Sequence, residues 1–192
     1  MKRNSCYAAF GLLLLVACSK QAELPVFNTV PDFTLIERSL REVSRQDLAG
    51  EVWIADFIFT HCAGTCPLMT AKMRKLQDTL PAEIQLVSFS VDPVQDTPEV
   101  LKEYAQRYGA DPKRWLFLTG NKDAIYKLSI EGFKLGLDDS GSAAEPITHS
   151  TRFALVDRQG RIRGYYGMND ETALVRLAKD VKALLRGRTD RW

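Results

Sequence analysis

The run from Glu51 to Thr60 constrains the fold of this chain most strongly, because most of its side chains are large and apolar. Such a strand is usually buried on both faces at the centre of a sheet. The chain then passes through His61-Cys62-Ala63-Gly64-Thr65-Cys66-Pro67, and the proline suits a first helical position before apolar side chains at 69, 73 and 76. The sequence therefore predicts two thiols where a buried strand meets a helix.

A cysteine pair at such a junction serves either metal capture or disulfide exchange. Unpaired backbone N–H groups and the positive end of the helix dipole favour a thiolate there, and the thiolate is the reactive and metal-binding form. The spacing of Cys62 and Cys66 puts their Cβ atoms about 5 to 6 Å apart if both are helical. A loop position for Cys62 also lets the two sulfurs converge. Three residues separate Cys62 from Cys66, whereas two separate the cysteines of the familiar dithiol oxidoreductases.

The N-terminus predicts export and lipidation. Lys2 and Arg3 precede an apolar run that ends near Ala17 and is too short to span a bilayer. Leu15-Val16-Ala17-Cys18 resembles the lipobox of bacterial lipoproteins, in which a signal peptidase cuts before the cysteine and the cysteine carries the lipid. We expect a lipoprotein signal peptide over 1–17, a lipidated tether over 18–30 and one domain over 31–192. An ordinary secreted protein or an uncleaved anchor is the alternative.

Cleavage before Cys18 leaves 192 − 17 = 175 residues, enough for one domain with a substantial core. Cys6 leaves with the signal and Cys18 takes the lipid, so Cys62 and Cys66 are the remaining thiols. A disulfide between them would close only a short loop and would add little to the stability of a domain of this size. Removing the two basic residues of the signal leaves 26 − 2 = 24 basic and 24 acidic residues, a formal charge of zero. Nothing in that balance indicates nucleic-acid binding.

The remaining elements predict an α/β protein. We expect strands at 31–36, 84–91 and 115–119 and a hairpin over 152–166. We expect helices after Cys66, after an N-cap at Thr97, over 121–130 and after a cap at Asp170, with an exposed loop or insertion over 132–148. This order is that of the thioredoxin fold, a central mixed sheet flanked by helices on both faces. Here it carries an N-terminal strand extension and a long loop insertion before the final hairpin.

His149 is the predicted third ligand. It lies just before the hairpin strand, and in a thioredoxin fold that position faces the cysteine pair. The other histidine, His61, adjoins Cys62 and is expected to point away, into strand-end packing or an outer hydrogen bond. Two thiolates and one imidazole match three-coordinate Cu(I) better than a closed zinc site, and an open zinc site with water is the alternative. Met69 and Met73 have the spacing of a buried helix face.

Three motifs together resemble the Sco/SenC family of copper-binding, thioredoxin-like assembly proteins of cytochrome c oxidase. The resemblance implies that Cys62, Cys66 and His149 bind copper, as Cu(I) or Cu(II), and that Asp92 supports the site from a neighbouring strand end. An Asp92 that only forms a turn before a proline is the alternative. Thr148 stands where many members of the family have an aspartate. The motifs are FIFTHCAGTCP at 57–67, SVDPVQDTP at 90–98 and HSTRFALVD at 149–157.

The same resemblance implies a copper chaperone that assists assembly of the binuclear copper centre of cytochrome c oxidase. One alternative is a membrane-tethered thiol-disulfide oxidoreductase that reduces the cysteines of the recipient site, and another is a lipid-tethered binding module with a structural disulfide. Expected partners are the copper-receiving oxidase subunit, other copper chaperones, thioredoxin-like reductants and a membrane, but no nucleic acid. The expected location is the bacterial cell envelope, facing the periplasm or extracytoplasmic space.

Overall fold

The computed structural model describes residues 23–62, 64–138 and 147–187, so the predicted signal peptide, Cys6 and Cys18 lie outside the described residues. The strands are β1 (Asn28–Thr29), β2 (Thr34–Glu37), β3 (Glu42–Ser44), β4 (Trp53–Ile58), β5 (Gln85–Ser90), β6 (Trp115–Thr119), β7 (Leu137–Asp138), β8 (Thr148–His149), β9 (Arg152–Val156) and β10 (Arg161–Gly167). The α-helices are α1 (Thr65–Thr79), α2 (Pro98–Arg107), α3 (Lys122–Lys127) and α4 (Ala173–Arg186). A short 3-10 turn, η1 (Arg45–Leu48), follows β3, and a π turn, η2 (Leu128–Gly132), extends α3.

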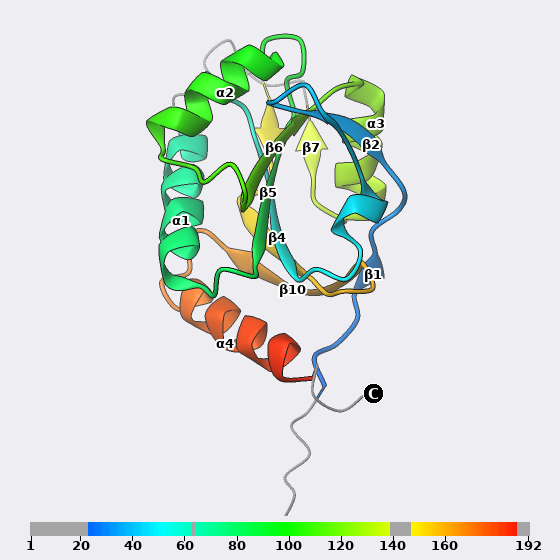
Figure 1. Ribbon diagram of the computed structural model, residues 1–192, viewed down its shortest axis with the longest axis vertical. Helices are drawn as coiled ribbons and strands as arrows, with labels where there is room; N and C mark the ends of the chain where they lie inside the picture. Colours follow the sequence, from blue (N-terminus) through cyan, green and yellow to red (C-terminus); the bar gives the residue numbers. More distant parts are fainter. Residues whose placement is uncertain (1–22, 63, 139–146, 188–192) are drawn as a thin grey trace, which may run out of the picture.

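One mixed sheet of eight strands forms the centre of the molecule, in the order β1-β10-β9-β4-β5-β6-β2-β3 (Figure 1). The apolar run predicted to be central forms β4, and all six of its residues are buried. β4 runs parallel to β5 and antiparallel to β9. Aromatic rings of neighbouring strands contact one another, and Phe57 of β4 stacks on Phe89 of β5 with ring centroids 5.0 Å apart. Burial of these rings fixes the strand that leads into the cysteine pair.

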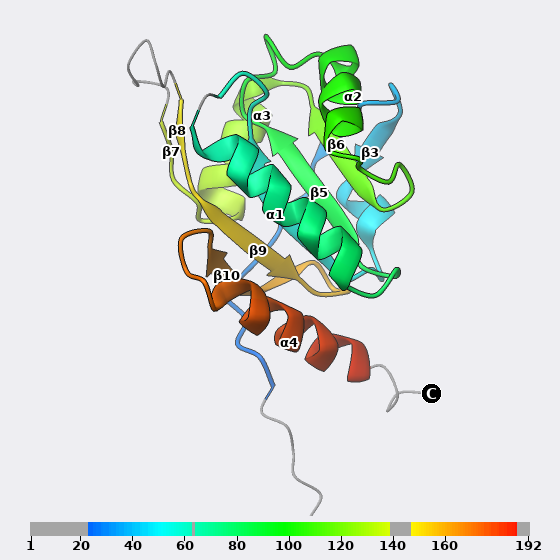
Figure 2. The same cartoon turned by 90° about the vertical axis from the view of Figure 1, so that its left-hand side faces the viewer.

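Helices cover both faces of this sheet, as the sequence predicts. α1, α2 and α4 lie on one face, and α3 lies on the other (Figures 1 and 2). α1 buries Met69 and Met73 completely, which confirms that the two methionines belong to the core. The thioredoxin-like α/β architecture is therefore confirmed.

Packing of the chain begins before Pro31. β1 pairs with β10, with Asn28 opposite Ile162, and Val30 is buried. The Arg163 guanidinium also donates to the Pro25 carbonyl at 3.1 Å. Contacts with the domain thus reach into the segment predicted as a tether, because β10 offers a free edge for pairing. Within the described residues, no helix is long and apolar enough to cross a membrane.

The structure differs from the prediction in two further places. Thr172, not Asp170, is the N-cap residue of α4. The Asp170 carboxylate instead accepts from the Thr172 backbone N–H at 2.8 Å, so it stabilises the turn that leads into the helix. The segment predicted as a loop or insertion, 132–148, contains β7 and the first residue of β8. These two strands form a second sheet, in which Leu137 of β7 pairs with His149 of β8. Residues 139–146, between these strands, lie outside the described part.

Candidate metal centre

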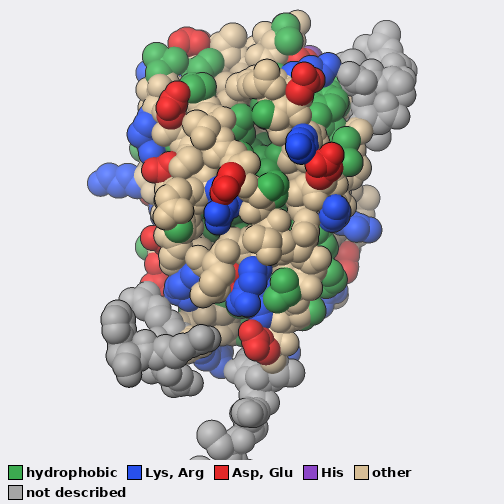
Figure 3. All heavy atoms as spheres, turned by 90° about the vertical axis from the view of Figure 1, so that its right-hand side faces the viewer, with side chains coloured by type: hydrophobic (Ala, Val, Ile, Leu, Met, Phe, Trp, Pro, Cys, Tyr) green, Lys and Arg blue, Asp and Glu red, His purple; other side chains and the backbone are tan. Residues whose placement is uncertain are grey.

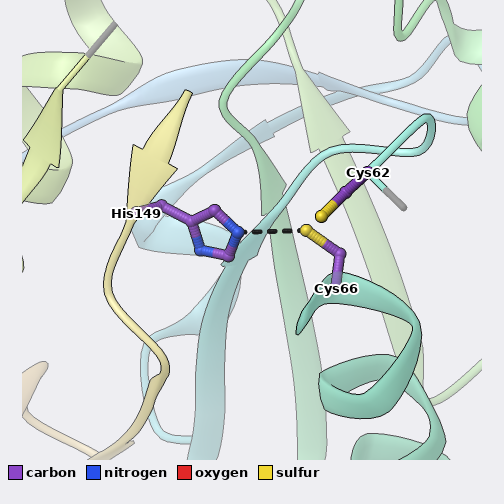
Figure 4. A group of neighbouring side chains, drawn as sticks. All are labelled: Cys62, Cys66 and His149. Carbon is purple, nitrogen blue, oxygen red and sulfur yellow. Dashed lines mark hydrogen bonds between the residues drawn. The ribbon is translucent and has the colours of Figure 1, made fainter. Parts of the chain in front are cut away.

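Cys62, Cys66 and His149 converge at one end of the sheet (Figure 4). Their ligand atoms, two Sγ and one imidazole nitrogen, all lie within 4.8 Å of one another. The Nε2 atom of His149 lies 3.0 Å from the Cys66 Sγ atom. Both cysteines are free thiols. The three residues that the sequence singles out are therefore brought together from positions up to 87 apart in the chain (149 − 62).

Each of the three side chains is positioned by a different element. Cys66 lies in the first turn of α1 and is buried, whereas Cys62 lies in the loop after β4 and is half-buried. His149 ends β8, whose pairing with β7 holds the ring over the cysteines. The edge of the His149 ring also faces the Phe59 ring, with centroids 5.8 Å apart. The buried strand, the helix start and the small second sheet together build the site.

The hydrogen bonding of His149 leaves Nε2 available to bind a metal. Its Nδ1 atom lies 3.2 Å from the Ser150 carbonyl oxygen, which can only accept a hydrogen bond. Nδ1 therefore carries the proton, and Nε2 presents its lone pair to the Cys66 thiol. A backbone carbonyl that fixes the tautomer in this way is typical of metal-binding histidines.

Burial raises the pKa of the Cys66 thiol above its ordinary value. The nearby Cys62 and Asp56 add to the rise, and a hydrogen bond from the Phe59 backbone opposes it. The prediction of a thiolate at the helix N-terminus is therefore wrong for metal-free Cys66, because removal of the sulfur from water disfavours its charged form. A metal that binds this sulfur must displace a proton.

Asp92, which the sequence associates with the site, contacts His61 and not the three converging residues. The His61 Nε2 atom lies 3.2 Å from the Asp92 Oδ2 atom, and the ring is half-exposed. His61 thus turns away from the cysteines, as its place beside Cys62 predicts.

Asp96 supports the cysteine loop, and the sequence reasoning assigned it no role. Its carboxylate is fully buried and accepts hydrogen bonds from the Thr60 hydroxyl at 2.6 Å and the Thr60 backbone N–H at 3.1 Å. The Ser90 hydroxyl donates a third at 2.6 Å. This carboxylate joins the end of β4, where the cysteine loop starts, to the end of β5. Its position just before the helix cap Thr97, after a buried strand, is the sequence signal that could have found it.

Asp56 is a second buried carboxylate close to the site. It lies in β4, and its Oδ1 atom accepts from the Ser88 hydroxyl at 2.6 Å. Among the described residues, its Oδ2 atom has no hydrogen-bond partner. Burial raises the pKa of Asp56 to about 7, and the Ser88 hydrogen bond opposes the rise. The charge of this group therefore acts on the Cys66 thiol from inside the core.

The fold agrees with the comparisons to known proteins. The model of the SCO1/SenC family matches residues 21–186. The chain belongs to the SCO1/SenC family. A SCO1 protein homolog of Bacillus subtilis is 36% identical over 180 residues, which cover 90% of this chain and 93% of the relative. A protein of Stutzerimonas stutzeri named "Putative copper-binding protein" is 34% identical and covers 86% of this chain and 78% of its own length.

Two solved SCO1/SenC structures share both the fold and about a third of the sequence. A SCO1/SenC family lipoprotein from Bacillus anthracis has a TM-score of 0.78 at 35% identity, over 85% of this chain and 99% of the other. BsSco, described as a member of the Sco family of cytochrome c oxidase assembly proteins with a disulfide switch, has a TM-score of 0.76 at 34% identity. That match covers 85% of this chain and 98% of BsSco.

Proposed function

We propose that this SCO1/SenC protein binds copper through Cys62, Cys66 and His149 and delivers it to the binuclear copper centre of a cytochrome c oxidase subunit. The observation that carries the proposal is the convergence of two sulfurs and one imidazole nitrogen within 4.8 Å. Two soft thiolates with one imidazole suit Cu(I) in a three-coordinate site. Relatives described as copper-binding and as oxidase assembly proteins support this choice of metal and recipient.

Anaerobic titration of the reduced protein with Cu(I) tests the copper site. We expect about one copper per chain, and X-ray absorption with two sulfur neighbours and one nitrogen neighbour, because the site offers those three donors. The double variant Cys62→Ser/Cys66→Ser should lose the stoichiometric site. Copper bound with the same affinity and sulfur coordination in that variant would refute the assignment.

A membrane-tethered thiol-disulfide oxidoreductase is the second candidate function. The half-buried Cys62 can attack a partner disulfide, and the buried Cys66 can then resolve the mixed disulfide. The pair is oxidised to one disulfide while the partner gains two thiols. The disulfide switch attributed to BsSco favours this candidate.

Two single variants separate the two functions. Under the reductase function, Cys62→Ser abolishes reduction of the recipient's disulfide while His149→Ala has little effect, because imidazole takes no part in the exchange. Under the chaperone function, His149→Ala impairs copper transfer to the recipient. The readouts are thiol labelling of the purified oxidase subunit and its copper content after mixing.

We also propose that Cys18 carries the lipid and anchors the protein to the bacterial cell envelope, facing the extracytoplasmic space. The short apolar run before Cys18 and the relative described as a lipoprotein support this location. Mass spectrometry of the purified protein should find a lipid on Cys18 as the first residue. An unmodified Cys18 within an intact N-terminus would contradict the proposal.

A further inference from the structure

A groove between α1 and α4 carries a concentration of positive charge. Four basic side chains and one acidic side chain line it, and all four basic residues are exposed. Its floor is apolar, with Leu76 buried below and Val175 71% exposed at the rim. Because the mature chain has a formal charge of zero, the excess is local to this groove. The charged residues of the groove are Lys75, Lys179, Lys182, Arg186 and Glu171.

Three of these basic groups form no ion pair with another described residue. Among the ion pairs of the described residues, none involves Lys75, Lys179 or Lys182. On the same two helices, Arg74 is paired with Asp78 and Arg176 with Asp170. Unpaired lysines around an apolar floor are suited to an external anionic surface.

The opposite side of the molecule has a different surface. Figure 3 shows the face on the right of Figure 1, where Lys and Arg side chains are interspersed with Asp and Glu around hydrophobic groups. On α3, which covers the other face of the sheet, Lys127 lies 4.0 Å from Glu131 of the following turn. The groove therefore differs from this face in its excess of basic over acidic side chains.

The groove lies at the end of the molecule where the chain comes from its predicted anchor. In both ribbon views, α4 and the first described residues occupy the same end of the molecule, opposite the start of α1 (Figures 1 and 2). Arg163 of β10 pairs with Glu23 and donates to the carbonyls of the next two residues. β10 in turn contacts α4, where the Tyr166 hydroxyl donates to Asp180 at 2.7 Å.

We infer that the groove between α1 and α4 docks on the head groups of an anionic lipid bilayer. The inference rests on the proposed lipidation of Cys18 and adds an orientation to it. Glu23 is five residues from Cys18, so it lies at most about 18 Å from the lipidated residue along a fully extended chain. At that reach, the α4 end of the domain is the end nearest the membrane.

Charge and tethering together make the contact favourable. Each basic side chain near an anionic leaflet strengthens binding by about fivefold at moderate ionic strength. The lipid anchor makes the docking step intramolecular, so a weak contact is populated without free encounter. The apolar floor lets the lysine stems and Val175 lie against the bilayer interface while the ammonium groups meet phosphate.

The docked orientation places the metal centre away from the membrane. α1 runs from Cys66, at the end of the molecule opposite α4, toward Lys75 at the groove (Figures 1 and 2). The groove thus fixes the domain on the surface while Cys62 and His149 face outward. A recipient then meets the copper site at a distance of one domain from the bilayer.

Lysine acetylation of the lipidated mature protein, bound to purified vesicles, tests this inference. The vesicles consist of phosphatidylcholine, with or without phosphatidylglycerol, and mass spectrometry gives the acetylation rate at each lysine. We expect Lys75, Lys179 and Lys182 to react several-fold more slowly only when phosphatidylglycerol is present. Lys122 and Lys127 of α3 serve as internal controls and should not change. Salt at about 1 M, where the Debye length is about 3 Å, should remove the protection.

A pair of matched variants sharpens the test. In Lys179→Gln/Lys182→Gln, loss of two charges should weaken docking about 30-fold and expose Lys75. In Lys122→Gln/Lys127→Gln, protection of Lys75 should persist.

Three results would overturn the docking inference. They are equal acetylation in both lipids, protection that persists in pure phosphatidylcholine or at high salt, and equal protection of the α3 lysines. The last two would indicate that something other than anionic lipid protects the lysines, such as a protein partner, a second copy of the chain or nonspecific adsorption. A protein that fails to float with either vesicle refutes lipidation, and docking with it, whereas a protein that floats unprotected refutes docking alone. Copper binding, measured on the same samples, is independent of both.

Discussion

Asp56 makes the stability of the metal-free protein depend on pH, and Asp56→Asn should remove that dependence. The carboxyl has an ordinary pKa of 3.8, and burial in β4 raises it to about 7 in the folded protein. Between these values the folded state retains a proton that the unfolded chain releases. Rising pH therefore favours unfolding, and the stability present at low pH is lost as pH rises from about 4 through 7.

The size of the effect follows from the shift in the pKa of Asp56. A shift of about three units is worth about 4 kcal/mol once the group is ionised in both states. Part of this is already lost at pH 5, so the free energy of unfolding should fall by about 3 kcal/mol between pH 5 and pH 8 on account of Asp56. Asp56→Asn keeps an acceptor for Ser88 but cannot ionise, and the constant cost of burying its amide lowers stability equally at both pH values.

Urea unfolding of the reduced, metal-free protein at the two pH values measures this difference. Asp123→Asn, an exposed substitution at the start of α3, is the matched control and should follow the wild type. The quantity to compare is the change in unfolding free energy from pH 5 to pH 8 in each variant. If wild type and Asp56→Asn change in parallel, the buried carboxylate does not titrate as reasoned.

Three further predictions follow from the site and its supports. Asp96→Ala leaves three hydrogen-bond donors without their acceptor and should lower the unfolding free energy by about 3 to 5 kcal/mol in urea titrations. Asp92→Ala removes an 18% exposed carboxylate whose partner His61 is half-exposed, and it should cost under about 1 kcal/mol. Thr97→Ala removes the cap of α2 and should cost about 1 kcal/mol by the same assay. Oxidation of Cys62 and Cys66 to a disulfide should abolish Cu(I) binding in anaerobic titrations, and dithiothreitol should restore it, because a disulfide supplies no thiolate.

The architecture could be predicted from the sequence because its main signals are local. The apolar content of β4 reflects burial on both faces of the strand, and the helical spacing after Cys66 reflects burial of one face of the helix. The N-cap at Thr97 acts within three residues and was found for the same reason. β3 was missed, since its three residues form a strand only by pairing with β2.

The convergence of Cys62, Cys66 and His149 was predictable from the sequence, but the electrostatics of the site were not. The place of the cysteine pair between a buried strand and a helix, and of His149 just before the hairpin strand, predicted that the three side chains meet. The raised pKa of Cys66 depends on how completely the fold buries the sulfur, which no spacing reveals. Asp56 and Asp96 are likewise ordinary polar residues in the sequence. Their importance comes from burial beside Ser88 and Thr60, which tertiary packing alone decides.

The Cu(I) affinity of His149→Ala, measured anaerobically against a competing chelator, tests the central claim most directly. Loss of a residue that only orients a ligand typically costs 10 to 100-fold in affinity, so loss of a ligand should cost more than about 100-fold. His61→Ala is the matched control, since that ring contacts Asp92 and not the cysteines, and it should change the affinity by less than about tenfold. An unchanged affinity in His149→Ala would contradict the three-ligand copper site.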